Sequence, residues 1–164
     1  MIKEIIEKIS SYNIFNYLLP GILFAVCLDA STDYNVIIDN TLLGLFVYYF
    51  YGLMVSRLGS LIVEPLLKKT KFISFADYGD FITASRKDPK IELLSEVNNM
   101  YRTLLSVPVF IVVIYLYSVI ETELPWIVPA RMPVALLLLA LVLAFSYRKQ
   151  TEYITKRIKK GLEE

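Results

Sequence analysis

The hydrophobic residues of this chain lie in four long blocks that polar segments separate. The blocks run from about residue 14 to 28, 41 to 67, 103 to 120 and 130 to 147. A helix needs about 20 mostly apolar residues to cross the hydrocarbon core of a bilayer, which is roughly 30 Å thick. The pattern therefore predicts an all-α integral membrane protein with four transmembrane helices. We expect residues 1–164 to form one membrane domain, and a mean hydropathy of +0.55 is too apolar for a typical soluble domain.

Two proline-containing stretches modify the helical pattern. Pro20 and Gly21 interrupt the first block. A proline inside a helix removes a backbone donor and clashes with the preceding turn, so we expect a kink or a break there. Asp88 and Pro89 favour a helix start, with Asp88 as the N-cap and Pro89 at the first helical position. We expect that helix to continue into the third block as an extension outside the membrane. Its apolar face is formed by Ile91, Leu94, Val97 and Tyr101.

The N-terminal residues before the first block alternate between isoleucines and charges. The isoleucines recur at helical spacing, with the charges on the opposite side; they are Ile2, Ile5, Ile6 and Ile9. This pattern predicts a short amphipathic helix on the membrane surface. A plain extension of the first transmembrane helix explains it equally well.

Basic residues are concentrated in segments that should share one side of the membrane. Of the 17 Lys and Arg, two lie near the N-terminus, seven in the loop 68–102 and six in the tail 148–164. The segments 29–40 and 121–131 carry five acidic residues and a single basic one, Arg131. The positive-inside rule then predicts that both termini and the long loop are cytoplasmic.

The second block carries small residues four positions apart and two charges beside them. Gly52, Ser56 and Ser60 allow a close helix–helix contact, within the subunit or between subunits. Arg57 and Glu64 flank this face. A charge in the bilayer costs at least about 2.5–3.5 kcal/mol on insertion scales, so Arg57 needs water or a partner. Its side chain could extend to the cytoplasmic interface, pair with Glu64 or a neighbouring subunit, or line a water-filled path. Together these five residues are the candidate pore or intramembrane polar positions.

Several kinds of catalytic chemistry find no support in the sequence. There is no histidine and only one cysteine, Cys27. The commonest general base and metal ligand is therefore missing, and no intramolecular disulfide is possible. No Gly-rich phosphate loop and no pair of carboxylates within one block are present. We therefore expect neither an enzyme nor a cofactor or metal site, and we expect the carboxylates outside the membrane to be solvated.

Charged surfaces at the two sides of the membrane suggest which ions and ligands the protein attracts. If subunits surround a pore, an acidic outer mouth would concentrate cations. That mouth would consist of Asp29, Asp33 and Asp39. A basic cytoplasmic face would bind anionic lipid headgroups or a single-stranded nucleic acid. The candidate ligand-binding residues are Lys68, Lys69, Lys71, Arg86, Lys87, Arg102, Arg148 and Lys149. Charges that only set the membrane topology are the simpler interpretation.

Three stretches of the chain are similar to segments of a known class of membrane proteins. The segments VSRLGSLIVEPLLKK, ASRKDPKIELLSEVNNMYR and NIFNYLLPG resemble small four-span membrane effectors of bacterial anti-phage defence, in particular the channel subunits of Hailong systems. The resemblance covers about residues 14–102, and its motifs carry no known chemistry. It implies a homo-oligomeric ion channel, a tetramer, in the bacterial inner membrane. Single-stranded DNA oligomers made by a nucleotidyltransferase partner would control it, and opening would depolarise the host and arrest growth.

Two functions from different classes follow from the sequence. The first is an oligomeric channel or pore-forming effector that an anionic ligand gates from the cytoplasm. The second is a non-conducting membrane anchor or adaptor that recruits a cytoplasmic partner through the loop 68–102. A channel is toxic and depolarising without its regulator, whereas an adaptor is not.

Overall fold

All regular elements in the computed structural model, which describes residues 13–162, are helical. In chain order they are η1 (Ile14–Leu18), α3 (Leu19–Ser31), α4 (Thr41–Leu58), η2 (Gly59–Val63), α5 (Glu64–Lys69), α6 (Tyr78–Lys87), α7 (Lys90–Glu123), η3 (Pro125–Ala130) and α8 (Arg131–Leu162). Here η1 and η2 are π-helical turns and η3 is a 3₁₀-helix. The amphipathic helix expected over residues 2–9 lies outside the described residues.

Four helical segments are long and apolar enough to cross a membrane, as the hydrophobic blocks predict. They are Ile14–Ser31, Thr41–Lys69, Lys90–Glu123 and Pro125–Leu162. The third and fourth extend well beyond their hydrophobic blocks. The 34 residues of α7 correspond to a length of about 51 Å at 1.5 Å per residue, which exceeds the apolar thickness of a bilayer. The expected continuation of this helix before the third hydrophobic block is thus present, as one continuous helix.

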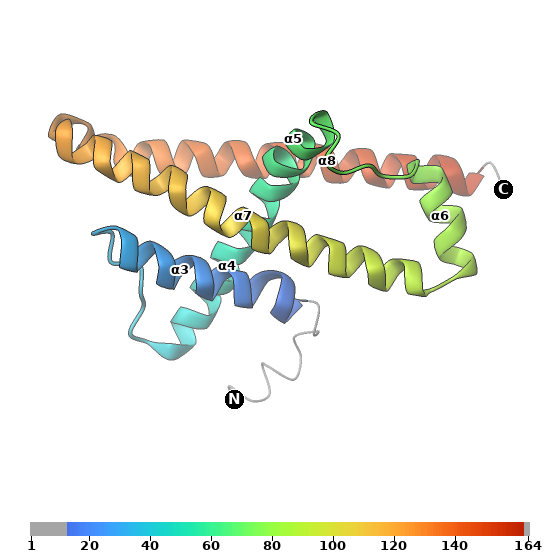
Figure 1. The fold of residues 1–164 in the computed structure, drawn as a ribbon, viewed down its shortest axis with the longest axis horizontal. Helices are drawn as coiled ribbons and strands as arrows, with labels where there is room; N and C mark the ends of the chain where they lie inside the picture. Colours follow the sequence, from blue (N-terminus) through green and yellow to red (C-terminus); the bar gives the residue numbers. More distant parts are fainter. Residues whose placement is uncertain (1–12, 163–164) are drawn as a thin grey trace.

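The segments between the helices gather at two ends of the molecule (Figure 1). We call the end formed by α6 and the C-terminal part of α8 the basic end. The acidic end contains the connection 32–40 and the turn from α7 through η3 to α8. Between the two ends, α4 crosses α3 and α7 obliquely and reaches α5 (Figure 1). Both ends therefore connect to the same oblique helix.

The small residues of α4 lie where it crosses its neighbours. A Cβ atom on Gly52 would meet the backbone carbonyl of Tyr17, and one on Gly21 would meet the carbonyl of Tyr48. Backbones therefore touch at this crossing, and the small-residue face packs within the subunit. The apolar core beside it is formed by Phe24, Leu28, Val55 and Val107.

Of the kink or break expected at Pro20 and Gly21, the break does not occur. The helix continues from η1 into α3 with Pro20 in its first turn. A proline ring clashes with the carbonyl four residues before it and offers no N–H. The π-helical turn moves the hydrogen bonds to i−5 and widens the backbone just before the proline. The same arrangement recurs at η2, which ends one residue before the pair Glu64 and Pro65.

The loop 68–102 contains a helix that the sequence pattern did not predict. This helix is α6, and Asp77 caps its start. The Asp77 side chain accepts a hydrogen bond of 2.7 Å from the backbone N–H of Gly79. The following helix, α7, begins at Lys90, one residue later than expected. Pro89, and not Asp88 as expected, occupies the N-cap position, although Asp88 Oδ1 still accepts a hydrogen bond of 3.0 Å from the N–H of Lys90. Its predicted apolar face is present, but Leu94, for example, is 65% exposed.

Candidate functional site

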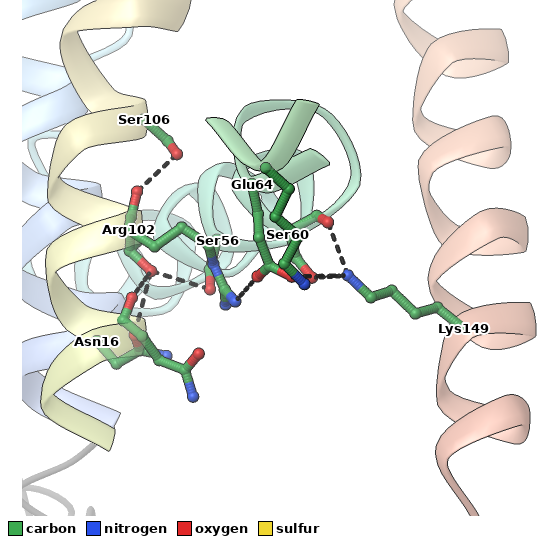
Figure 2. A network of polar contacts seen from close by, with 10 residues as sticks. Asn16, Ser56, Ser60, Glu64, Arg102, Ser106 and Lys149 are labelled. Atoms are coloured by element: carbon green, nitrogen blue, oxygen red, sulfur yellow. Dashed lines mark hydrogen bonds and ion pairs between the residues drawn. The ribbon is translucent and has the colours of Figure 1, made fainter. Parts of the chain in front are cut away.

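Polar side chains from six elements meet around η2 and α5, between α7 and α8 (Figure 2). We call this group the polar cluster. Its members are Asn16, Ser56, Ser60, Glu64, Arg102, Thr103 and Lys149. Buried polar groups are costly unless they are hydrogen-bonded, so a cluster of this size among apolar helices needs an explanation in either packing or function.

The inner part of the polar cluster is a set of neutral hydrogen bonds. The hydroxyl of Thr103 is fully buried and lies 3.1 Å from both Asn16 Oδ1 and Ser56 Oγ. The same hydroxyl lies 2.9 Å from the backbone carbonyl oxygen of Asn99. Its single proton goes to one of these three acceptors at a time, and the Ser56 hydroxyl can in turn donate to Thr103. Ser56 and Asn16 are themselves buried. These contacts hold η1, α4 and α7 together, which is a structural role.

The outer part of the polar cluster is built around one carboxylate. Glu64 Oε2 accepts a hydrogen bond of 2.7 Å from Arg102 Nη1. Its Oε1 lies 3.0 Å from Lys68 Nζ and 3.9 Å from Lys149 Nζ. Glu64 is only 7% exposed. Three cations thus share a single buried anion, and they come from α5, α7 and α8.

Lys149 also binds a backbone carbonyl that the helix leaves free. Its Nζ donates to Ser60 O and Ser60 Oγ, both at 2.7 Å. In the π-helical turn η2, the N–H of Glu64 pairs with the carbonyl of Gly59. The next donor in that pattern would be residue 65, but Pro65 has no N–H. The Ser60 carbonyl therefore accepts from Lys149 instead, which links α8 to η2.

Arg57 does not pair with Glu64, although that was one of its three expected roles. Between residues 13 and 162, no residue forms a hydrogen bond or an ion pair with Arg57. Its side chain instead lines two cavities at the basic end. Its charge thus faces open space beside Ser56 and Ser60. Three interpretations of Arg57 remain: extension of its side chain to the cytoplasmic interface, a pair with a neighbouring subunit, and a water-filled path.

A cavity of about 630 Å³ opens at the basic end and includes part of the polar cluster. We call it the basic cavity. Its charged lining residues are the cations Arg57, Lys68, Arg102 and Lys156 and the anion Glu64. Four cations facing one carboxylate give it a surplus of positive charge. A smaller cavity of about 30 Å³ adjoins it and adds Lys149. Such a site attracts anions.

Aromatic and amide groups line the rest of the basic cavity. Tyr78 stands between Phe81 and Tyr153, with ring centroids 6.3 Å and 5.5 Å apart. Lys68 Nζ lies 4.2 Å above the ring of Phe75. The amide side chains are Asn98, Asn99 and Gln150. Rings, amides and cations together are the groups that bind nucleotide bases and phosphates.

The structure brings together only part of the predicted ligand-binding set. Lys68 and Arg102 line the basic cavity, and Lys149 lines its smaller neighbour. The others are exposed and lie outside both linings; they are Lys69, Lys71, Arg86, Lys87 and Arg148. Arg148 pairs with Glu152 at 3.3 Å on the surface of α8. Sequence reasoning missed Tyr153, and it placed Lys156 on the basic cytoplasmic face without including it among the candidate ligand-binding residues. The spacing of both residues from Lys149 places them on one side of α8.

The predicted acidic mouth lies partly around a second cavity, of about 490 Å³. Asp29 and Asp33 line this cavity at the acidic end, whereas Asp39 is exposed outside it. Asp29 Oδ1 accepts a hydrogen bond of 2.9 Å from the N–H of Val36. This carboxylate therefore also orders the connection after α3.

Not all carboxylates outside the hydrophobic blocks are solvated, contrary to expectation. Glu121 is 5% exposed and accepts from Arg131 at 2.6 Å and 2.9 Å and from the Tyr34 hydroxyl at 2.8 Å. The Arg131 guanidinium stacks 4.5 Å above the ring of Tyr34. Burial and the hydrogen bond to Glu121 raise the pKa of Tyr34 to about 12. These three residues form a charge-balanced group in the lining of the cavity at the acidic end.

Metal-binding geometry and similarity to known proteins give no further identification. Within residues 13–162, no three His, Cys, Asp or Glu side chains converge to hold a metal ion. No protein family, no curated protein and no solved structure matches this chain. The polar cluster and the basic cavity are therefore interpreted from their own chemistry.

Proposed function

We propose that this protein is a homo-oligomeric membrane ion channel that an anionic ligand gates from the cytoplasmic side. The observation that carries the proposal is the basic cavity, in which four cations face one carboxylate directly beside the transmembrane helices. A channel regulator needs a binding site that touches the moving helices. Residues from α4, α5, α7 and α8 all line this cavity, so a ligand there contacts each of them.

The chemistry of the basic cavity favours a single-stranded nucleic acid as that ligand. Phosphates bind Lys and Arg with release of counterions, and bases stack on aromatic rings. Arg102 and Lys156 supply cations, while Tyr78 and Tyr153 supply rings in the same cavity. The positive-inside rule favours a cytoplasmic location for this end. A DNA oligomer made by a nucleotidyltransferase partner, as the resemblance implies, has this chemistry.

Conduction requires several subunits, because one set of four helices is too small to enclose a water-filled path. No residue of α8 is buried within the subunit, and all of its leucines except Leu139 are exposed. This apolar surface would contact lipid on one side and neighbouring subunits on the other. We propose a homotetramer in the bacterial inner membrane with both termini cytoplasmic. Asp29 and Asp33 would then draw cations to the opposite entrance.

The biological outcome proposed for this channel is anti-phage defence. Loss of the regulating ligand or its arrival during infection would open the channel, depolarise the membrane and arrest growth. Support comes from the resemblance to defence effectors and from the position of an anion site against the transmembrane helices. A protein of this kind needs no catalytic group of its own.

Planar-bilayer recording of the purified protein tests the proposal directly. Single-stranded DNA oligomers are added to the side that carries the basic end, and we expect discrete currents that the oligomer changes. Addition to the opposite side is the control and should leave the currents unaltered. A silent bilayer with well-folded, oligomeric protein, with and without the oligomer, would refute the channel.

The exposed surface between α5 and α6 supports the alternative function, a membrane adaptor. Phe72 is 78% exposed there, next to the exposed Lys69 and Lys71. A partner protein docking on this segment would explain those side chains without any conduction. Expression in cells with a potential-sensitive dye separates the two functions. Depolarisation on expression without the regulator identifies a channel, whereas an adaptor leaves the potential unchanged.

A further inference from the structure

We infer that the Glu64 carboxylate is an internal competitor that occupies the anion position of the basic cavity until a ligand displaces it. The inference rests on the proposed function, because it assumes that the cavity binds an anionic ligand. Among the described residues, Glu64 is the only acid in the lining, and its two oxygens contact Arg102 at 2.7 Å and Lys68 at 3.0 Å. A phosphate group of a ligand would bind the same cations.

The contacts of Arg102 are incomplete while Glu64 occupies this position. Arg102 Nη1 donates to Glu64, but its Nε–H is buried and has no acceptor among the described residues. A buried donor without a partner is unfavourable. A phosphate, with more acceptor oxygens than a carboxylate, can satisfy several guanidinium donors at once. Replacement of Glu64 by such a group would therefore improve the pairing of Arg102.

Displacement of Glu64 would be transmitted to α8 through Lys149. The ammonium group of Lys149 lies 3.9 Å from Glu64 Oε1 and 2.7 Å from both oxygens of Ser60. None of the residues of α8 is buried, so few other contacts fix this helix against α4. When a ligand phosphate attracts Lys149, it loosens this link. The position of α8 would then report whether the cavity holds Glu64 or the ligand.

Removal of the carboxylate by Glu64→Gln tests this inference. The full chain is placed in lipid nanodiscs, and binding of a fluorescein-labelled single-stranded DNA ten-mer is followed by fluorescence anisotropy. We expect the variant to bind about tenfold more tightly than wild type, because the competitor is gone. The slope of log Kd against log salt should also steepen by about 0.7, which corresponds to one more neutralised phosphate on a single strand.

The matched control is Glu96→Gln, which removes an equal charge from α7. Glu96 is exposed and does not line the basic cavity. If the lost negative charge acts only through long-range electrostatics, both variants should bind DNA more tightly by a similar factor. A Kd for Glu64→Gln that equals or exceeds the Kd of Glu96→Gln overturns the inference, while wild-type binding still upholds the ligand site. No DNA binding by any variant would instead refute the proposed function itself.

A second variant covers the case in which Glu64→Gln does not fold, as judged by size-exclusion chromatography. Glu64→Asp keeps the charge but withdraws it from Arg102 by one methylene. We expect it to bind DNA more tightly than wild type, by a smaller factor than Glu64→Gln. If neither variant yields folded protein, Glu64 is a structural clamp and the inference is wrong.

Discussion

The two ends of this molecule treat buried charge in opposite ways. At the acidic end, Glu121, Arg131 and Tyr34 satisfy one another through hydrogen bonds and a stacked ring. At the basic end, Glu64 has to serve Lys68, Arg102 and Lys149, and Arg57 remains without an anionic partner among residues 13–162. A balanced group stabilises a fold, whereas a surplus of one charge is unfavourable until another molecule neutralises it. We therefore propose a structural role for the group of Glu121, Arg131 and Tyr34 at the acidic end and ligand binding for the basic end.

The largest effect should come from removing the central cation of the basic end. We expect Arg102→Gln to weaken DNA binding by about a hundredfold, because truncation of one partner in a buried charge contact costs at least about 2–5 kcal/mol. Lys68 and Lys149 still face Glu64, so the fold should persist. Arg131→Gln at the acidic end is the control for binding and should leave the Kd unchanged. Fluorescence anisotropy in nanodiscs measures the Kd of both variants. An equal loss of DNA affinity in the two variants would contradict the proposed difference between the ends.

The crossing that connects the two ends should be the next most sensitive feature. Gly52→Ala places a methyl group against the carbonyl of Tyr17, and backbone has to move to accept it. We expect the apparent Tm in detergent to fall by about 8 °C, which corresponds to a few kcal/mol for a chain of this size. Gly161→Ala meets no atom within 4 Å and should leave the Tm unchanged. A Tm for Gly52→Ala that matches wild type would contradict the backbone contact.

The acidic end is predicted to contribute to stability rather than to ligand binding. Glu121→Gln removes the charge that Arg131 and Tyr34 share, so we expect the apparent Tm to fall by about 5 °C. Glu123→Gln, an exposed neighbour, should have no effect. DNA binding should be the same in both variants. A change in Kd without a change in Tm would reverse the assignment of this end.

The smallest predicted effect concerns the link between η2 and α8. Pro65→Ala supplies the missing N–H, which can pair with the Ser60 carbonyl and release Lys149 from it. We expect DNA to bind about threefold more tightly, because Lys149 is then free to reach a phosphate. Pro20→Ala changes the matching proline after η1, far from Lys149 along the chain, and is the control. Equal Kd values for the two variants would show that the Ser60 carbonyl does not restrain Lys149.

Much of the architecture follows from local sequence patterns. Four hydrophobic blocks predicted four helices, Asp88 and Pro89 predicted the start of α7 to within one residue, and Gly52 and Ser56 predicted a close contact. Each of these signals involves residues within a few helical turns. The amphipathic N-terminal helix stays a prediction, as do the membrane orientation and the subunit number.

The composition of the site, by contrast, depends on contacts between distant residues. Arg102 reaches Glu64 across 38 positions, and Lys149 reaches Ser60 across 89. Counting basic residues gave eight candidates without indicating which of them converge. A pair between Arg57 and Glu64, one of the alternatives that the sequence left open, does not form, because Glu64 instead contacts Arg102 on α7 and Lys149 on α8, which local spacing could not indicate. The buried Glu121 was missed for the same reason.

The π-helical turn η2 also determines which way the chain after it faces. In a regular α-helix, Glu64 would lie about 80° around the axis from Ser56, eight residues earlier, at 100° per residue. A π turn accommodates one extra residue, which rotates everything that follows back by about 100°. Glu64 therefore points to nearly the same side as Ser56, toward α7 and α8, where both meet the polar cluster. The turn thus acts as a one-residue insertion that sets the direction of the Glu64 carboxylate. A variant that lacks one residue of Gly59–Val63 and carries Pro65→Ala should therefore form a regular helix with Glu64 still on that side.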